Sequence, residues 1–95
     1  MIRILLVEDQ EIVRRGLKTL LETKSDFQVV GEASNGQQAI EQVQSLYVSA
    51  KPPDVVLMDI RMPVMDGVTA TQQICQQFPE TKILVLTTFD DVQYI

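Results

Sequence analysis

The chain contains no histidine and no tryptophan, and it has a single cysteine. Without histidine it cannot form a His-ligated zinc site or a Ser-His-Asp triad, and it cannot phosphorylate itself on histidine. A single cysteine excludes an intrachain disulfide and a cysteine-rich metal site. Because Cys75 lies among apolar residues, we expect it to be a small core residue.

Basic side chains are also scarce. The chain has 13 acidic and 8 basic residues, a formal net charge of -5, and no cluster of lysines and arginines. Direct binding of nucleic acid by these residues is therefore disfavoured. There is no charged leader followed by an apolar core, and no apolar stretch of about 18 residues. We therefore expect no signal peptide, no membrane span and a cytoplasmic location.

What the chain does contain is a regular alternation of two kinds of segment. Hydrophobic residues make up 45% of it, which suits the core of one compact domain. Short aliphatic runs, typical of buried strands, alternate with segments in which apolar residues recur at helical spacing. The expected strands are 2–7, 27–33, 55–58 and 82–86, and the expected helices are 11–22, 36–47 and 67–78. This order predicts an α/β fold, a doubly wound parallel sheet with helices on both faces.

Polar residues mark where these elements begin. Asp9 is placed to cap the first helix, Ser34-Asn35-Gly36 has the turn and cap chemistry that precedes the second, and Asp66 and Gly67 open the third. In the expected strand 27–33, Gln28 and Glu32 interrupt the apolar run, which favours a position near an edge of the sheet.

Three of the four expected strands are followed by polar side chains. Glu8 and Asp9 follow the first, Asp59 the third, and Thr87 and Thr88 the fourth. The carboxyl ends of parallel strands lie on one edge, where open α/β sheets hold their ligands, so these side chains can converge.

Carboxylates held together in this way repel one another and raise each other's pKa unless they share a cation. With no Cys or His cluster available, all-oxygen ligation favours Mg²⁺ or Mn²⁺, and Mg²⁺ best. A carboxylate beside such an ion is a competent nucleophile for phosphoryl transfer and would give an aspartyl phosphate. Threonine hydroxyls nearby could donate to a phosphoryl oxygen. An isolated Asp59 would be equally consistent with the mere end of a strand, and Asp9 alone with a simple helix cap.

Together these residues resemble the receiver domain of two-component response regulators. The resemblance rests on Glu8-Asp9, on Asp59, on the motif Met62-Pro63-x-Met65-Asp66-Gly67 and on Thr87. It covers nearly the whole chain and implies a flavodoxin-like receiver fold. Receivers have a fifth strand and helix, with a lysine at the end of that strand. We therefore expect residues 1–95 to be a receiver domain truncated at its C-terminal end.

Further segments resemble a particular kind of receiver. Residues 13–17, 31–36 and 86–91 are most similar to receivers joined to a C-terminal helix-turn-helix DNA-binding domain of the LuxR type. The resemblance thus implies a sensor histidine kinase as partner, and control of an output, transcriptional domain. DNA would be bound only through that missing domain.

The resemblance also implies a role for each site residue. Asp59 looks like the phospho-acceptor. Glu8 and Asp9 look like the acidic pair that holds Mg²⁺ together with Asp59, and Arg61 like the residue whose backbone carbonyl completes the protein ligands.

Two further residues look like the switch of the family. The Thr87 hydroxyl would turn toward the phosphoryl group, and the backbone N–H of Thr88 would assist. Such a protein is not an enzyme beyond its self-catalysed aspartyl phosphorylation and dephosphorylation.

Two other functions fit the same architecture. The first is an interaction module that keeps the fold but does not respond to phosphate, and its mark would be loss of an acid at position 8, 9 or 59; all three are present. The second is an enzyme such as a flavodoxin-like or phosphatase domain. A flavin or nucleotide site would need a Gly- or Thr-rich loop after the first strand, where the chain has Glu8-Asp9-Gln10.

The expected strand 82–86 would form an edge of the sheet. With no further strand beside it, this strand would expose backbone donors and acceptors next to aliphatic side chains. We therefore expect the chain to form a homodimer if it is stable in this form.

Overall fold

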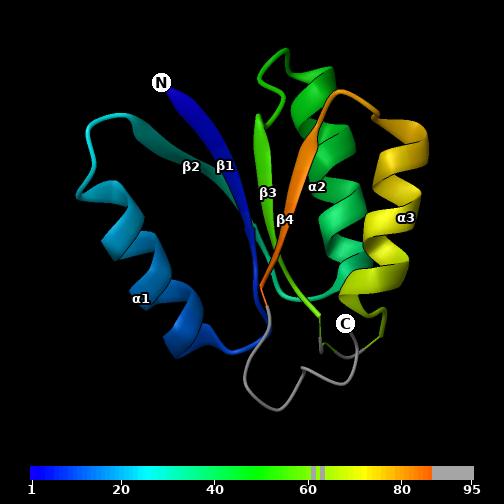
Figure 1. The fold of residues 1–95 in the computed structure, drawn as a ribbon, viewed down its shortest axis with the longest axis horizontal. Coiled ribbons are helices and arrows are strands. Elements are labelled where there is room, and N and C mark those ends of the chain that lie inside the picture. Colours follow the sequence, from blue (N-terminus) through cyan, green and yellow to red (C-terminus); the bar gives the residue numbers. More distant parts are fainter. Residues whose placement is uncertain (61, 63, 87–95) are drawn as a thin grey trace.

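The computed structural model describes residues 1–60, 62 and 64–86, and Figure 1 shows the resulting fold. Strands and helices alternate along these residues, as predicted from the apolar periodicity. The elements are β1 (Ile2–Val7), α1 (Glu11–Glu22), β2 (Phe27–Ala33), α2 (Gly36–Val48), β3 (Val55–Asp59), α3 (Gly67–Gln77) and β4 (Lys82–Leu86).

The four strands form one parallel sheet in the order β2-β1-β3-β4. β2 lies at an edge, which confirms the prediction from its polar residues. β1 is paired on both sides, with Val7 opposite Ala33 of β2 and Met58 of β3. The chain adds β2 on one side of β1 and β3 on the other, so the winding direction changes between β1 and β3. The carboxyl ends of these two strands are therefore the place where a sheet of this kind holds a ligand.

Helices α2 and α3 cover one face of the sheet, and α1 lies on the other (Figure 1). The hydrophobic core lies under α2 and α3. Its fully buried side chains are Leu5, Val7, Val56 and Met58 from the sheet, and Ala39, Val43, Ala70 and Ile74 from the helices. The Tyr47 and Phe78 rings stack at a centroid distance of 4.7 Å and extend this packing to the amino-terminal end of the strands.

Helix α1 packs less completely than its sequence predicted. None of its residues is buried: Leu17 and Leu21 are half-buried, whereas Ile12 is 86% and Leu20 63% exposed. Among the described residues, α1 is the only helix on its face of the sheet. An apolar groove of about 360 Å³ therefore runs between α1 and the strands. It is lined by Ile2, Ile4, Leu17, Leu21, Phe27, Val55, Leu57, Leu84 and Leu86.

Two of the three predicted helix caps are confirmed. The Asn35 side chain accepts a hydrogen bond from the Gln38 N–H, and the Asp66 side chain accepts one from the Thr69 N–H, each at 2.8 Å. The prediction that Asp9 caps α1 is wrong. The N-cap residue is Gln10, whose side chain makes no capping bond.

The expectation that Cys75 is a core residue is also wrong, because its side chain is exposed. Ala70 and Ile74 define the buried face of α3. Cys75 follows Ile74 by one residue, which places it about 100° around the helix and outside that face.

In the part of the chain that the structure describes, no helix is long and apolar enough to cross a membrane.

Candidate metal and phosphorylation site

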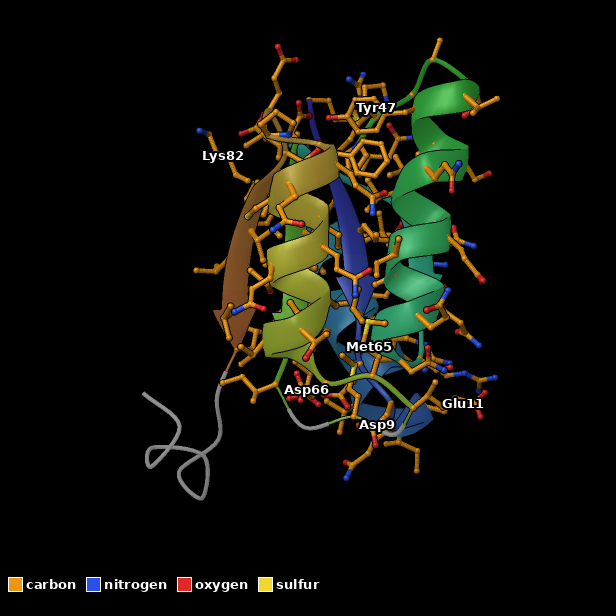
Figure 2. All side chains as sticks on the ribbon, turned by 90° about the vertical axis from the view of Figure 1, so that its right-hand side faces the viewer. Asp9, Glu11, Tyr47, Met65, Asp66 and Lys82 are labelled. Carbon is orange, nitrogen blue, oxygen red and sulfur yellow. The ribbon has the colours of Figure 1, made fainter. Side chains whose placement is uncertain are left out.

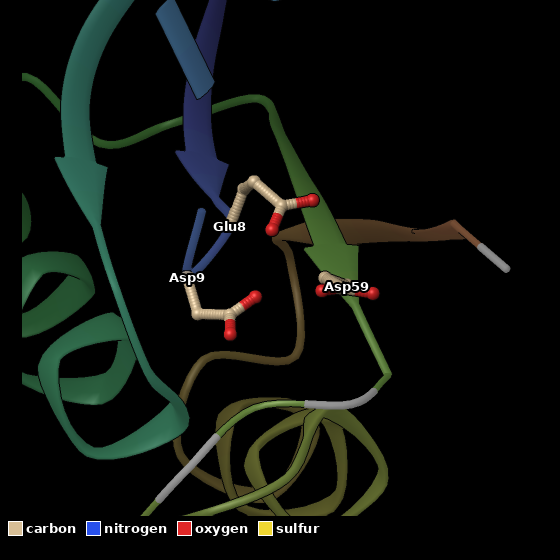
Figure 3. A group of neighbouring side chains, drawn as sticks. All are labelled: Glu8, Asp9 and Asp59. Carbon is tan, nitrogen blue, oxygen red and sulfur yellow. The ribbon is translucent and has the colours of Figure 1, made fainter. Parts of the chain in front are cut away.

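Three acidic side chains meet at the carboxyl ends of β1 and β3. Carboxylate oxygens of Glu8, Asp9 and Asp59 all lie within 4.8 Å of one another. Figure 3 shows the carboxylates of Glu8 and Asp9 directed toward Asp59. The structure therefore brings together the three acids that the strand-end pattern predicted to converge.

Glu8 and Asp59 are positioned by the ends of their strands, β1 and β3. The Glu8 backbone N–H donates to the Ala33 carbonyl at 3.0 Å, and so joins the end of β1 to the end of β2. Asp59 is the last residue of β3, lies opposite Leu86 of β4 and is only 9% exposed. Asp9 is exposed. The cluster thus has one buried member, and solvent reaches it from the side of Asp9.

Gly67, the first residue of α3, forms part of the wall behind Asp59. Its N–H donates to the Ile60 carbonyl at 2.8 Å. A β-carbon at this position would overlap the backbone carbonyl oxygen of Asp59, so only glycine allows α3 to begin so close to β3. The sequence pattern had marked Gly67 as a helix start, but not as a neighbour of the acid.

The electrostatics of the cluster oppose full ionisation. The pKa of Glu8 is raised from 4.5 to about 7, mainly because the carboxylate is partly buried. A hydrogen bond with Asp9 and the negative charges of Asp59 and Asp9 raise it further, while the Gln10 N–H, which donates to the Glu8 carboxylate at 2.9 Å, lowers it. A divalent cation would remove this repulsion.

The donor set suits a hard cation. The cluster offers carboxylate oxygens and no nitrogen or sulfur ligand, which is the chemistry that Mg²⁺ prefers. Glu8, Asp9 and Asp59 would hold the ion. The Arg61 carbonyl, the Thr87 hydroxyl and the Thr88 N–H lie outside the described residues, so their roles remain predictions.

A contact that the sequence analysis missed reaches this site from α1. Arg14 donates from Nη1 to the backbone carbonyl of Glu8 at 2.8 Å, and from Nε to the Glu32 carboxylate at 3.1 Å. A charged residue in an amphipathic helix is expected on the solvent side, so the sequence pattern gives no sign of this contact. No local pattern points to a bond that joins residues 18 positions apart.

A flavodoxin-like parallel sheet with an acid cluster at its switch point defines the class of receiver domains. The chain belongs to the response regulator receiver domain family, whose family model matches residues 4–95. The resemblance drawn from the acid pair, Asp59 and the motif around Met65 is thus confirmed.

Individual relatives agree with this assignment. The transcriptional regulatory protein LnrK of Bacillus subtilis (strain 168) is 47% identical over 91 residues, which are 96% of this chain and 39% of that protein. The chain thus spans about two fifths of the length of this relative. A solved two-component response regulator of the LuxR family from Aurantimonas sp. SI85-9A1 is 35% identical, with a TM-score of 0.80 over 90% of this chain and 57% of that one.

A further solved structure, RcsB from Salmonella enterica serovar Typhimurium, is bound to promoter rprA in the presence of the phosphomimetic BeF3⁻. It is 29% identical, with a TM-score of 0.80 over 92% of this chain and 69% of that one. The chain is therefore similar to receivers found in transcriptional regulators, including members of the LuxR family.

Proposed function

We propose that Asp59 accepts a phosphoryl group from a sensor histidine kinase in a Mg²⁺-dependent reaction. The observation that carries this proposal is the meeting of Glu8, Asp9 and Asp59 within 4.8 Å, in a chain that belongs to the receiver family. The same three acids give no support to the alternative of an interaction module that ignores phosphate, since that module would need none of them.

The reaction is a displacement at phosphorus. A carboxylate oxygen of Asp59 attacks the phosphorus of a phosphohistidine, a P–O bond forms, the P–N bond breaks, and the imidazole leaves with the electron pair. When bound, the metal ion would neutralise charge on the phosphoryl oxygens and on the attacking carboxylate. Glu8 and Asp9 would hold that ion together with Asp59, and the exposed Asp9 marks the side from which a donor can approach. We assign the Arg61 backbone carbonyl to the same ion.

Recognition of the phosphoryl group belongs to the residues after β4. We propose that the Thr87 hydroxyl and the Thr88 N–H donate hydrogen bonds to its oxygens, since both residues follow the strand next to β3. Their approach to a phosphorylated Asp59 would change the surface of the domain.

The output of this switch would be transcription. LnrK is named a transcriptional regulatory protein, and RcsB is described on a promoter together with a phosphomimetic. We propose that the full protein is a cytoplasmic regulator in which a LuxR-type domain, outside this chain, binds DNA. The acidic character of the chain, with a net charge of -5, supports a division in which the receiver itself does not bind DNA.

We also propose that the chain associates as a homodimer through β4. Among the described residues β4 pairs only with β3, and its Leu84 and Val85 side chains are 56% and 38% exposed. Light scattering on the purified chain tests this proposal. A dimer whose fraction rises with concentration would support it, and a monomer at high concentration would contradict it.

The phosphorylation proposal is tested by incubating the chain with acetyl phosphate, with Mg²⁺ or with EDTA, and measuring its intact mass. We expect a single phosphoryl group with Mg²⁺ and none with EDTA. Phosphorylation that is insensitive to EDTA would contradict the metal requirement, and no phosphorylation by acetyl phosphate or by a panel of kinases would contradict the function.

A further inference from the structure

Arg14 lies between the acid site and the edge strand β2. Its side chain is only 18% exposed, although α1 as a whole is poorly buried. The guanidinium spans two acceptors on different elements, the Glu8 carbonyl at 2.8 Å and the Glu32 carboxylate at 3.1 Å. A planar guanidinium with several fixed donors is suited to such bridging, whereas an ammonium group is not.

The carbonyl that Arg14 contacts lies just past the sheet. Val7 is the last residue of β1 with partners in β2 and β3, so the Glu8 carbonyl is beyond the last paired residues of the strand. In the turn that follows, Gln10 makes no capping bond with its side chain, and its N–H donates to the Glu8 carboxylate at 2.9 Å. The Arg14 guanidinium, through its Nη1–H, therefore holds the backbone from which the Glu8 carboxylate projects.

Glu32 holds Arg14 in turn. One of its carboxylate oxygens accepts from Arg14, and the other lies 3.4 Å from the Lys18 ammonium, so two cations of α1 fix this carboxylate. The next residue of β2, Ala33, accepts from the Glu8 N–H. Glu8, just after β1, is thus linked to β2 in two ways. Its N–H bonds directly to Ala33, and its carbonyl is joined to Glu32 through the Arg14 guanidinium.

We propose that Arg14 is a positioning residue for the metal site, an inference that rests on the proposed function. Held by Glu32, it fixes the backbone of Glu8 and Asp9 so that their carboxylates face Asp59. Its hydrogen bond at the turn is to the backbone carbonyl of Glu8. Loss of such an indirect partner in metal sites typically weakens metal binding by about 10-fold or more.

The direction in which Mg²⁺ affinity changes when Arg14 is replaced distinguishes a positioning role from a purely electrostatic one. Removing a positive charge near a cation site should strengthen cation binding on electrostatic grounds. Removing a group that positions the ligands should weaken it. Arg15 provides a matched control because it is adjacent, carries the same charge, is 75% exposed and, within the described part of the chain, pairs with Glu11 of the same helix.

The experiment is a calorimetric titration of the chain with Mg²⁺ alone, for wild type, Arg14→Gln, Arg14→Lys and Arg15→Gln. We expect Arg14→Gln to raise the Kd about 10-fold. Arg14→Lys keeps the charge but cannot span both acceptors, so we expect it to weaken binding as well. We expect Arg15→Gln to change the Kd less than about twofold, since an exposed charge is screened by salt. Circular dichroism identifies any variant that does not fold. If Arg14→Gln does not fold, the Mg²⁺ affinity of Arg14→Lys provides the test.

The double variant Arg14→Gln/Glu32→Gln tests whether Glu32 affects the metal site through its contact with Arg14. If Glu32 acts through Arg14, the double variant binds Mg²⁺ no more weakly than Arg14→Gln alone. Unchanged or tighter Mg²⁺ binding by folded Arg14 variants would overturn the positioning role while leaving the proposed function intact. A wild-type chain that does not bind Mg²⁺ would overturn both.

Discussion

Asp54 immediately precedes strand β3 and Asp59 is its last residue, and the surroundings of the two acids differ. At the amino end, the Asp54 carboxylate accepts a hydrogen bond from the Arg3 N–H at 2.8 Å, and the Asp54 N–H donates to the Arg3 carbonyl at 2.8 Å. At the carboxyl end, Asp59 lies 9% exposed beside two more carboxylates. Figure 2 shows the two ends, with Tyr47 and Lys82 at one and Asp9 and Asp66 at the other.

The difference separates an acid with a structural role, Asp54, from the acid that we propose to be reactive, Asp59. Asp54 completes backbone hydrogen bonds between β1 and the start of β3, which is a stabilising role that needs no other charge. At the carboxyl end, partial burial of the Glu8 carboxylate, together with the neighbouring Asp9 and Asp59, raises the pKa of Glu8 to about 7, so the fold holds these acids together against their repulsion. Clusters with perturbed pKa values are typical of functional sites, and here the family assignment agrees.

The largest expected effect follows from exchanging each of the two aspartates that flank the core of β3, Asp54 and Asp59, for asparagine. Asp59→Asn should abolish phosphorylation, because an amide oxygen is a far weaker nucleophile than a carboxylate. Asp54→Asn should leave phosphorylation unchanged, since the asparagine oxygen can still accept from the Arg3 N–H. Mass spectrometry after incubation with acetyl phosphate and Mg²⁺ measures both. An equal loss of phosphorylation in the two variants would contradict the assignment of a structural role to Asp54 and a reactive role to Asp59.

A smaller expected effect is the dependence of stability and of Mg²⁺ affinity on pH. Above pH 4.5 and up to about 7, Glu8 binds its proton more tightly in the folded chain than in the unfolded one. Its contribution to stability therefore decreases as pH rises through this window in metal-free protein. Mg²⁺ needs the ionised form, so its affinity should rise between about pH 6 and 8 and then level off.

Glu8→Gln is the variant that tests this pH dependence. It should weaken Mg²⁺ binding and remove most of the rise with pH, and the thermal midpoint of the metal-free variant should fall less between pH 5 and about 7 than that of wild type. Asp54→Asn is the control and should keep the wild-type profile. A wild-type affinity that is independent of pH would show that Glu8 is already ionised when the metal binds.

The smallest expected effect is a change in stability at the end of the sheet opposite the acid cluster, where the strands begin. Ala50 has a φ of 61° and follows α2, where its N–H donates to Tyr47 and the Lys51 N–H to Leu46, the bond pattern of a Schellman motif. Glycine usually occupies that position. Ala50→Gly should stabilise the chain by about 0.5–1 kcal/mol, because alanine is strained in the left-handed region while glycine loses more entropy on folding.

Urea unfolding measures the effect of Ala50→Gly, and phosphorylation of the variant should be unchanged. A loss of stability would show that the left-handed conformation is not maintained in solution. A change in phosphorylation would show that the two ends of the sheet are coupled.

The sequence predicted those features that depend on a few neighbouring residues. The strands, the order of elements, the caps at Asn35 and Asp66 and the convergence of the acids all follow from local patterns combined with the rules for parallel sheets. The failures have physical reasons. Asp9 was taken for a cap because it precedes a helix, but α1 begins after Gln10 and Asp9 turns to the acid cluster.

Other features depend on contacts between distant parts of the chain. Periodicity identified the apolar side of α1, but not how little of the described structure covers it, with Ile12 86% exposed. The bridge from Arg14 to Glu32 and the close approach of Gly67 to Asp59 are set by packing in three dimensions. No periodic pattern in the chain encodes them.

The most direct test of the account is to locate the phosphoryl group itself. The chain is phosphorylated by a histidine kinase or acetyl phosphate with Mg²⁺, the acyl phosphate is reduced with borohydride to homoserine, and the peptides are sequenced by mass spectrometry. We expect homoserine at position 59 and unmodified aspartate at positions 9 and 54. Homoserine at either of those positions, with Asp59 unmodified, would contradict the assignment of Asp59 as the phospho-acceptor.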